Sequence, residues 1–517
     1  MLGSTAENPE SLSIMKMMLR AFCLASALWA GLAGLALASP ERVALVLGMS
    51  AYQSIEPLTN TRNDAEALAK TLTDIGFDVT LGIDKTAEEL RTIMREFAFR
   101  SETADLALVY YAGHGIEVQG ENFLIPIDAR PTNNLEVQQQ SISLQEMLSV
   151  VERARKMRIV ILDSCRNNPL GGMIDLEKTQ AENLQAVAES TRGVGGLAAA
   201  NPDRGTLVAF AAKDGQVALD GSLGNSPYAR ALMDKMSEPG LEISLMFRQV
   251  RDSVLRETGN LQEPHTYGSL SGTPFYLSGA TEGQPDISGG APATTWSKLR
   301  PDQESQLLAL AEQGDTRSML GLAYIRLNPA DPRFDPAAAV DFLENAAARG
   351  SPEAQMELAK LYEQGLGVET NEKRALELYQ AAADQDFADA INDLGFLYYQ
   401  GGLGLRADPA KALALFERAA DLRQPEAQFN FAALIDDGLI AQKGPKDAAG
   451  YLYAALRSGS QDVLDLLLQR PKMFTLNTRE ELQKLLKSNN FYAGNIDGDF
   501  GPGTNRSIRA AYGLESD

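Results

Sequence analysis

From residue 41 to about residue 278, short uninterrupted apolar runs alternate with longer stretches in which apolar residues recur every three or four positions. Uninterrupted runs of this length are typical of strands that are buried on both faces of a mostly parallel sheet. Four runs have this character: VALVLGM (43–49), ALVYYAG (107–113), IVILDS (159–164) and TLVAFAA (206–212). The pattern therefore predicts a central sheet of buried strands.

The stretches between these runs have the spacing of amphipathic helices. Apolar residues fall on one helical face in three segments, 63–76, 87–98 and 143–155. Strands and helices that alternate in this way predict an α/β fold, a mostly parallel sheet with helices on both faces. Residues 171–205 interrupt the alternation with a stretch that is rich in Gly and Ala and too long for an ordinary connection, so we expect a mobile loop there.

Beyond a linker-like stretch at 278–295, the chain is helical and repetitive. Small residues recur with a period close to 36 residues, as they do in α-solenoids built from helix pairs. The segment EAQMELAKLYEQGLGVETNEKRALELYQAAA (353–383) resembles a Sel-one-like repeat, a branch of the tetratricopeptide class, and the resemblance spans about 305–460. It implies an all-α solenoid that recruits protein partners. The recurring residues are Ser318, Ala354, Ala390 and Ala427 in one series, and Ala339, Ala375, Ala412 and Ala448 in another.

The last segment, 479–513, resembles the small peptidoglycan-binding-like domain, whose hallmark is a Tyr-x-Gly-x-Ile-Asp-Gly-x-Phe-Gly-Pro-x-Thr turn. The resemblance implies a small α-helical domain with a role at the cell wall. The acidic turn does not fit a calcium loop, because a loop that starts at Asn495 needs glycine at its sixth position and has Phe500 there. The residues that match the hallmark are Tyr492, Gly494, Ile496, Asp497, Gly498, Phe500, Gly501, Pro502 and Thr504.

Residues 15–39 have the layout of a secretory signal: a short basic start, an apolar stretch and an Ala-Leu-Ala exit that places cleavage after Ala38. The polar residues 1–14 do not fit this layout, so we expect translation to start at Met15 or Met17. The layout predicts an exported, periplasmic protein. Because the apolar run is also about long enough to span a bilayer, an uncleaved N-terminal anchor helix is the alternative.

Length and charge bound the domain organisation and the partners. A chain of 517 residues is too long for one hydrophobic core, which predicts several domains. The formal net charge is −22 and no basic run occurs, whereas a nucleic-acid-binding surface needs clustered Lys and Arg, so we expect no nucleic-acid partner. The expected boundaries are a signal peptide at 1–38, an α/β domain at 41–278, a linker at 279–300, a solenoid at 301–470 and a small α-helical domain at 475–514.

Few residues in this chain are able to perform nucleophilic chemistry. The chain has two cysteines, Cys23 and Cys165, and two histidines, His114 and His265. Removal of the signal would remove Cys23 and leave one thiol, which can form no internal disulfide and is either reactive or sealed in the core. No zinc site can be built from this set of Cys and His, and we expect neither a metal nor a cofactor.

His114 and Cys165 are expected at the same edge of the predicted sheet. YYAGHG (110–115) and LDSC (162–165) each end a predicted strand, and sites in open α/β sheets form where the carboxyl ends of the strands meet. A thiol nucleophile needs a neighbouring base, usually an imidazole, to raise its thiolate fraction. The histidine precedes the cysteine by 51 residues, an order and spacing found in caspases. The sequence around both residues resembles the caspase-like clan, in its metacaspase and bacterial branches, over about 41–278.

This resemblance implies a cysteine endopeptidase and a role for single residues. Cys165 would be the nucleophile and His114 the general base and acid, and the N–H groups of Gly115 and Cys165 would form the oxyanion hole. Asp64 matches the acidic residue that metacaspases place at the base of their first specificity pocket. Asp163 lies two residues before the nucleophile, so strand alternation puts it on the same face. The two acids imply a pocket for Arg or Lys, because a buried acid pair is tolerable only when a cation arrives.

Several alternatives stay open at this point. The domain is either an active peptidase or an inactive relative that serves as a cell-envelope scaffold. The single thiol has two further alternatives, a role in a redox sensor or that of a small buried hydrophobe. His265 is a second candidate base, in a papain-like order, although the gap from Cys165 is short for that family. Asp64 has the alternative role of a helix N-terminal charge.

The Gly- and Ala-rich loop is an expected site of self-cleavage. It starts six residues after Cys165 and holds Lys178 and Arg192 among small and polar residues. Mobile loop tips are where proteolytic nicking concentrates, so a peptidase with a basic preference is expected to cut itself after one of these two residues. The alternative is that the loop is a flexible insertion and nothing more.

Overall fold

The computed structural model describes residues 42–165, 205–213, 218–221, 224–270, 272–278, 296–297, 299 and 301–514. The chain divides into two compact units, Ser39–Leu307 and Leu308–Asp517. The expected signal peptide, the loop with Lys178 and Arg192 and most of the expected linker lie outside the described residues. Within the described ranges, no helix is both long enough and apolar enough to cross a membrane.

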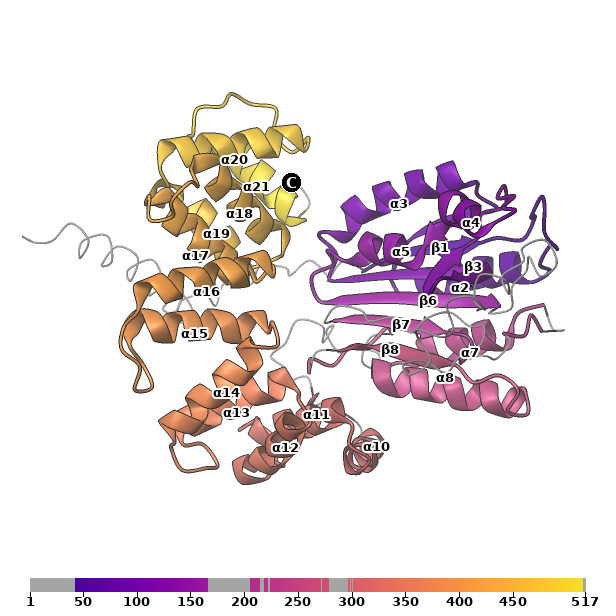
Figure 1. Cartoon of the computed structure of the whole chain (residues 1–517), viewed down its shortest axis with the longest axis horizontal. Coiled ribbons are helices and arrows are strands. Elements are labelled where there is room, and N and C mark those ends of the chain that lie inside the picture. Colours follow the sequence, from indigo (N-terminus) through magenta and orange to yellow (C-terminus); the bar gives the residue numbers. More distant parts are fainter. Residues whose placement is uncertain are drawn as a thin grey trace, which may run out of the picture. The chain divides into compact units, whose positions relative to one another are not determined.

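The first unit is built on one sheet (Figure 1). Its strands are β1 (Arg42–Gly48), β2 (Asp78–Ile83), β3 (Leu106–Val118), β4 (Glu121–Leu124), β5 (Ile142–Ser143), β6 (Met157–Cys165), β7 (Thr206–Phe210) and β8 (His265–Ser269). The main path has the order β2-β1-β3-β6-β7-β8, and each neighbouring pair is parallel except β7 and β8. β1 and β7 are buried along their whole length, as continuous apolar runs predict.

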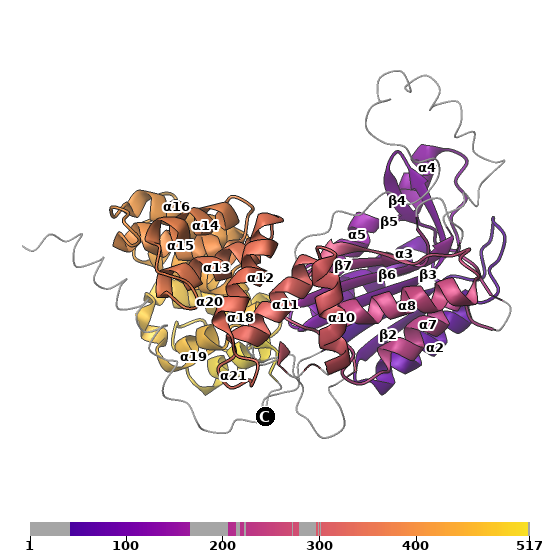
Figure 2. The same cartoon turned by 90° about the horizontal axis from the view of Figure 1, so that it is seen from below.

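Helices cover both faces of this sheet (Figure 2). They are α2 (Thr61–Asp74), α3 (Ala87–Ser101), α4 (Asn134–Gln140), α5 (Leu144–Val151), α7 (Pro227–Met236) and α8 (Ile243–Glu257). α3 and α5 pack against one face, where Leu90, Phe97 and Met147 join the main apolar core with Leu45 and Val109 of the sheet. α2, α7 and α8 lie on the other face. The α/β fold predicted from the alternating pattern is confirmed.

β3 extends beyond the end that its apolar run predicts. The run ends at Gly113, whereas the strand continues through His114 to Val118. Beyond His114 the strand leaves β6 and forms an antiparallel hairpin with β4, closed by Gln119 and Gly120, both of which have positive φ (56° and 83°). A hairpin with polar residues among its apolar ones gives no continuous apolar signal, so the periodicity did not reveal this extension.

Residues 301–469 form an all-α solenoid, as predicted. Its helices are α10 (Pro301–Glu312), α11 (Thr316–Leu327), α12 (Pro336–Ala348), α13 (Pro352–Gln364), α14 (Glu372–Ala383), α15 (Ala388–Gln400), α16 (Pro409–Asp421), α17 (Pro425–Asp436), α18 (Pro445–Arg457) and α19 (Gln461–Gln469). Successive helices pack against each other along the chain, α13 on α14 and α15 on α16 for example. The recurring residues Ala354, Ala390 and Ala427 are fully buried because the helices approach closely at these positions.

The C-terminal segment ends in two α-helices, α20 (Leu476–Ser488) and α21 (Pro502–Tyr512), joined by the Asp-Gly turn. Gln483 of α20 braces the turn: its Oε1 accepts the N–H groups of Asp497 and Gly498, and its Nε2 donates to Oδ1 of Asp497. α20 and α21 pack on the end of the solenoid, where Leu456 of α18 shares a core with Ile508. The turn residues that carry the resemblance therefore have a structural task in this unit.

Candidate active site

His114 of β3 and Cys165 of β6 are register partners in the parallel pair formed by these two strands. Neighbouring strands in a sheet lie about 4.8 Å apart, so the backbones of the two residues are adjacent. Cys165 is the last residue of β6, and its thiol lies outside the described atoms. The topology thus brings the predicted pair together at the carboxyl end of the parallel strands, where sites form in open α/β sheets.

The imidazole of His114 is buried, and its surroundings define its tautomer. Nε2 lies 2.9 Å from the carbonyl oxygen of Glu56. Because a carbonyl oxygen only accepts, Nε2 carries the proton and Nδ1 of the neutral ring is unprotonated. Nδ1 has no hydrogen-bond partner among the described residues. Burial lowers the pKa of His114 below its ordinary value, against the smaller opposing effect of the Glu56 carbonyl, so the ring is held in the neutral form that a general base needs.

Two tyrosine hydroxyls hold the backbone of His114. The hydroxyl of Tyr52 accepts the peptide N–H of His114 at 2.7 Å, and the hydroxyl of Tyr111 donates to its carbonyl oxygen at 2.8 Å. The ring of Tyr52 also packs against the imidazole, with 4.7 Å between the ring centroids. A Cβ atom on Gly113 would come within 2.6 Å of both hydroxyls. Glycine is required before the histidine because the two hydroxyls occupy the place of a side chain.

The loop between β1 and α2 carries both Tyr52 and Glu56, and Asp84 anchors the start of this loop. Oδ1 of Asp84 accepts the N–H of Ser50 at 2.7 Å and the N–H of the next residue at 2.9 Å. Burial alone would raise the pKa of Asp84, but these N–H groups and a neighbouring arginine outweigh it and hold the pKa below its usual value. A stable carboxylate thus fixes the loop that presents the Glu56 carbonyl to the imidazole.

Tyr52→Phe is expected to lower kcat for peptide cleavage about tenfold and to leave KM close to that of the wild type. The substitution removes the hydroxyl that accepts from the His114 peptide and keeps the ring that packs on the imidazole. Steady-state kinetics with an Arg-ended fluorogenic peptide measure the two constants separately. Tyr362→Phe is the matched control, because it removes a hydroxyl that donates to Glu344 in the solenoid. An unchanged kcat in Tyr52→Phe would show that the hydroxyl does not position the histidine.

Asp64 and Asp163 form a buried pair of carboxyl groups that Ser226 joins. Asp64 is 1% exposed and Asp163 is 8% exposed. The N–H of Ser226 donates to Oδ1 of Asp64 at 3.0 Å, and its hydroxyl donates to Oδ2 of Asp163 at 2.7 Å. Asn225 donates to the same oxygen of Asp64 at 2.8 Å, and Tyr110 donates to the same oxygen of Asp163 at 3.0 Å. One oxygen of each carboxyl group therefore receives two hydrogen bonds.

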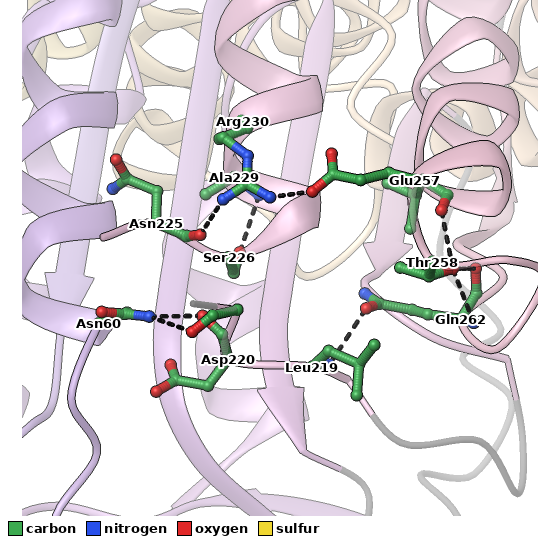
Figure 3. A network of polar contacts seen from close by, with 12 residues as sticks. Asn60, Leu219, Asp220, Asn225, Ser226, Ala229, Arg230, Glu257, Thr258 and Gln262 are labelled. Carbon is green, nitrogen blue, oxygen red and sulfur yellow. Dashed lines mark hydrogen bonds and ion pairs between the residues drawn. The ribbon is translucent and has the colours of Figure 1, made fainter. Parts of the chain in front are cut away.

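The second oxygen of each carboxyl group, Oδ2 of Asp64 and Oδ1 of Asp163, has no hydrogen-bond partner in the described part of the chain, and no ion pair there involves either acid. Arg230, whose charge lowers the pKa of Asp64, is itself paired with Glu257 (Figure 3). Burial raises the pKa of Asp64 to about 6 and that of Asp163 to about 7, and the charge of Asp64 adds to the shift of Asp163. An arriving cation would restore the charged form of both acids.

A third acid, Asp220, belongs to this cluster and was missed from the sequence. It follows β7, and its charge raises the pKa values of Asp64 and Asp163. It also opposes the lowering of the His114 pKa. Burial raises the pKa of Asp220 itself. The signal that points to Asp220 is positional, because β7 lies next to β6 and its carboxyl end feeds the same edge of the sheet.

Side chains from separate segments hold the stretch that carries Asp220 (Figure 3). Nδ2 of Asn60 donates to the backbone carbonyl of Asp220. Gln262 accepts the N–H of Leu219 at 3.1 Å and donates to the carbonyl of Ala211 at 2.8 Å. These bonds tie residues from three parts of the sequence, so the position of the third acid depends on tertiary contacts rather than on a local motif.

Gly115, the expected oxyanion donor, follows His114 at the point where β3 leaves β6. The N–H of His114 donates to Tyr52, and its carbonyl accepts from Ile125 at 3.0 Å. Because successive residues of a strand direct their backbone groups to opposite edges, the N–H of Gly115 faces the β6 side. A Cβ atom at this position would lie 3.0 Å from the hydroxyl of Ser164, so a side chain would crowd the site. The oxyanion role of Gly115 and Cys165 stays a prediction.

His265, the alternative base, lies on a strand that is not adjacent to β6. His265 begins β8 opposite Phe210 of β7, and β7 separates it from β6. The histidine whose backbone is paired with Cys165 is therefore His114. In the ranges that the structure describes, no group of three or more His, Cys, Asp or Glu side chains is arranged to hold a metal ion.

Comparisons with known proteins relate the two units to two families. Residues 41–276 match the caspase domain family, and 316–351, 352–387 and 388–423 match Sel1 repeats. The human mucosa-associated lymphoid tissue lymphoma translocation protein 1 is 30% identical over 127 residues, which are 24% of this chain and 15% of that protein. Its mouse homolog is 29% identical over 127 residues, with the same shares. The chain thus spans about 15% of the length of these relatives.

Among solved structures, the crystal structure of caspase-1 from Spodoptera frugiperda is similar to this chain with 17% sequence identity and a TM-score of 0.33. The similarity covers 47% of this chain and 92% of that chain. The family matches show that the chain has a caspase-like α/β domain followed by three Sel1 repeats in an all-α solenoid.

Proposed function

We propose that the caspase-like domain of this chain, residues 41–276, is a metacaspase-like cysteine endopeptidase that cleaves peptide bonds after Arg or Lys. The observation that carries the proposal is the buried acid pair of Asp64 and Asp163 at the sheet edge that also bears His114 and Cys165. Each acid keeps one oxygen without a hydrogen-bond partner in the described part of the chain. A guanidinium group supplies donors in a planar fork that suits two such oxygens.

The arrangement of His114 supports acyl-enzyme chemistry. Nδ1 accepts the thiol proton of Cys165, and the resulting thiolate attacks the scissile carbonyl carbon. The N–H groups of Gly115 and Cys165 stabilise the oxyanion. The C–N bond then breaks, the imidazolium returns its proton to the leaving amine, and a water activated by the same Nδ1 hydrolyses the thioester. Throughout these steps the Glu56 carbonyl accepts from Nε2 and keeps Nδ1 directed to the reacting atoms.

Fluorogenic peptides that end in Arg, Lys or Asp test the proposal on the full chain and on Cys165→Ala. We expect cleavage after Arg and Lys at least about 100-fold faster than after Asp, because an aspartate would enter a pocket lined by acids. Cleavage that persists in Cys165→Ala would come from a contaminant. A wild type that cleaves none of the peptides would favour the alternative of an inactive cell-envelope scaffold. Peroxide-dependent dimerisation without hydrolysis would favour the alternative of a redox sensor that uses the single thiol.

The proposal extends to location and partners. The expected signal peptide directs the chain to the periplasm, the Sel1 repeats recruit protein partners, and the C-terminal segment 475–514 acts at the cell wall. Sel1 repeats are helix pairs whose stacking creates an extended surface for other proteins, which supports the recruitment of partners. Cell fractionation tests the periplasmic location. Cosedimentation of the purified chain with peptidoglycan tests the role of the C-terminal segment at the cell wall.

A further inference from the structure

We infer that Ser226 sets the specificity of the acid pair by holding one oxygen of Asp64 and one oxygen of Asp163, so that the other oxygen of each acid is presented to the incoming cation. The inference rests on the proposed function and deepens it. Ser226 contacts the two acids and not the expected reacting atoms, so it is a positioning residue.

The hydrogen bonds of Ser226 leave it one orientation. Its hydroxyl oxygen accepts the N–H of Ala229 at 2.9 Å, as the N-cap of α7. The single hydroxyl proton is then directed to Oδ2 of Asp163, and the peptide N–H is directed to Oδ1 of Asp64. The two acids come from β6 and α2, so one residue ties three elements together.

Ser226 differs from the other residues that contact the pair. Tyr110 donates to Asp163 alone, and Asn225 donates to Asp64 alone. Among the described residues, Ser226 is the one that donates to both acids. Loss of its hydroxyl would leave Oδ2 of Asp163 held by Tyr110 alone, while Asp64 keeps both of its hydrogen bonds, so the carboxyl group of Asp163 would lose its fixed orientation relative to Asp64.

The position of Ser226 also explains how the fold tolerates two buried acids. It immediately precedes α7, whose N-terminal N–H groups carry the positive end of the helix dipole. Both acids are bonded to this one residue, so both lie at the helix N-terminus. Partial compensation by the helix lets the pair persist without a permanent cation, whereas a permanent cation would compete with the substrate.

The test measures binding in the Cys165→Ala background, where no cleavage intervenes. Fluorescence anisotropy gives the affinity for a labelled peptide with a single Arg and for the same peptide with neutral citrulline. We expect Ser226→Ala to weaken binding of the Arg peptide about tenfold and to leave the citrulline peptide unchanged. Ser226→Thr keeps a hydroxyl and should retain affinity within about threefold of the parent. In an Asp163→Asn background, Ser226→Ala should weaken binding of the Arg peptide by less than about a further twofold, because the main partner of the Ser226 hydroxyl is already altered.

Ser351→Ala is the matched control. Ser351 caps α13 in the solenoid within the same Ser-Pro-x-Ala pattern, and it accepts the N–H of Ala354 as Ser226 accepts that of Ala229. It should lower the melting temperature through the lost cap and leave the Arg-peptide affinity unchanged. A general loss of folding in Ser226→Ala would instead weaken the binding of the Arg peptide and of the citrulline peptide alike.

Three results would overturn the inference: an Arg-peptide affinity in Ser226→Ala equal to that of the parent, an equal loss for the citrulline peptide, or no binding of the Arg peptide to Cys165→Ala at all. Cleavage by the wild type is assayed separately. A wild type that binds the Arg peptide through Ser226 and does not cleave it ends the peptidase proposal and leaves this inference standing.

Discussion

His114→Ala is expected to lower kcat/KM for an Arg-ended peptide by about 10³-fold and to shift the alkylation of Cys165 to higher pH. The substitution removes Nδ1, the unprotonated ring nitrogen that has no hydrogen-bond partner among the described residues. Without it the thiol loses its proton acceptor and titrates like a free cysteine, at a pKa of about 8.5. With the imidazole in place, the thiolate should react with iodoacetamide well below that pH.

Mass spectrometry of the alkylated peptide, taken across a pH series, measures this shift in the wild type and in His114→Ala. His265→Ala is the control for a lost histidine, because His265 lies on β8 and is separated from β6 by β7. It should leave both the cleavage rate and the alkylation profile unchanged. A Cys165 that alkylates only near pH 8.5 in all three proteins would mean that the dyad is not assembled.

Asp163→Asn is expected to abolish most cleavage after Arg and at the same time to raise the melting temperature at pH 8. The substitution removes one of the carboxylates that would pair with the substrate cation, and losing one partner of a buried charge pair costs about 100-fold or more in kcat/KM. The uncharged amide keeps nearly the same shape and an oxygen that accepts from Tyr110 and Ser226. The substitution therefore separates charge from packing.

The sign of the stability effect follows from the pKa of Asp163. Burial raises this pKa to about 7, well above the value of an unfolded carboxyl group, so the folded protein binds the proton more tightly than the unfolded chain does. Protonation thus favours the folded state. The free energy of unfolding falls as pH rises toward 7, and the buried charge destabilises the domain above that pH. Asparagine removes this cost, and each kcal/mol recovered raises the melting temperature by about 2–4 °C.

Differential scanning calorimetry at pH 8 and pH 5 checks the stability part. We expect Asp163→Asn to melt higher than the wild type at pH 8 and the gain to be smaller at pH 5, because the cost of burying the acid is absent only below the pKa of the unfolded carboxyl group, about 3.9. Asp74→Asn serves as the control, because Asp74 is an exposed partner of Lys70 on α2. If Asp163→Asn melts lower than the wild type at pH 8, then the carboxylate stabilises the fold of the domain and is not a group kept for the substrate.

The sequence predicted the elements that carry the site better than it predicted their ends. The buried strands that end near His114 and Cys165 were evident from continuous apolar runs, and parallel topology alone placed the two residues side by side. The continuation of β3 into a hairpin was not evident, because residues beyond His114 alternate between apolar and polar. The expected helix at 143–155 also runs past the observed end of α5 at Val151, since helix ends are weakly encoded.

By itself the sequence determined the fold class, the solenoid and the pairing of His114 with Cys165, because apolar periodicity and strand order are properties of neighbouring residues and of chain direction. Only the tertiary structure decided how the pocket is built. Ser226 reaches Asp64 across 162 positions and Asp163 across 63, and no periodicity encodes contacts of such separation. The motif at Ser226 signals a helix start through its cap and the following proline. The same hydroxyl also donates to the buried Asp163 of β6, and this contact exists only because the folded chain packs α7 against α2 and brings Ser226 to β6.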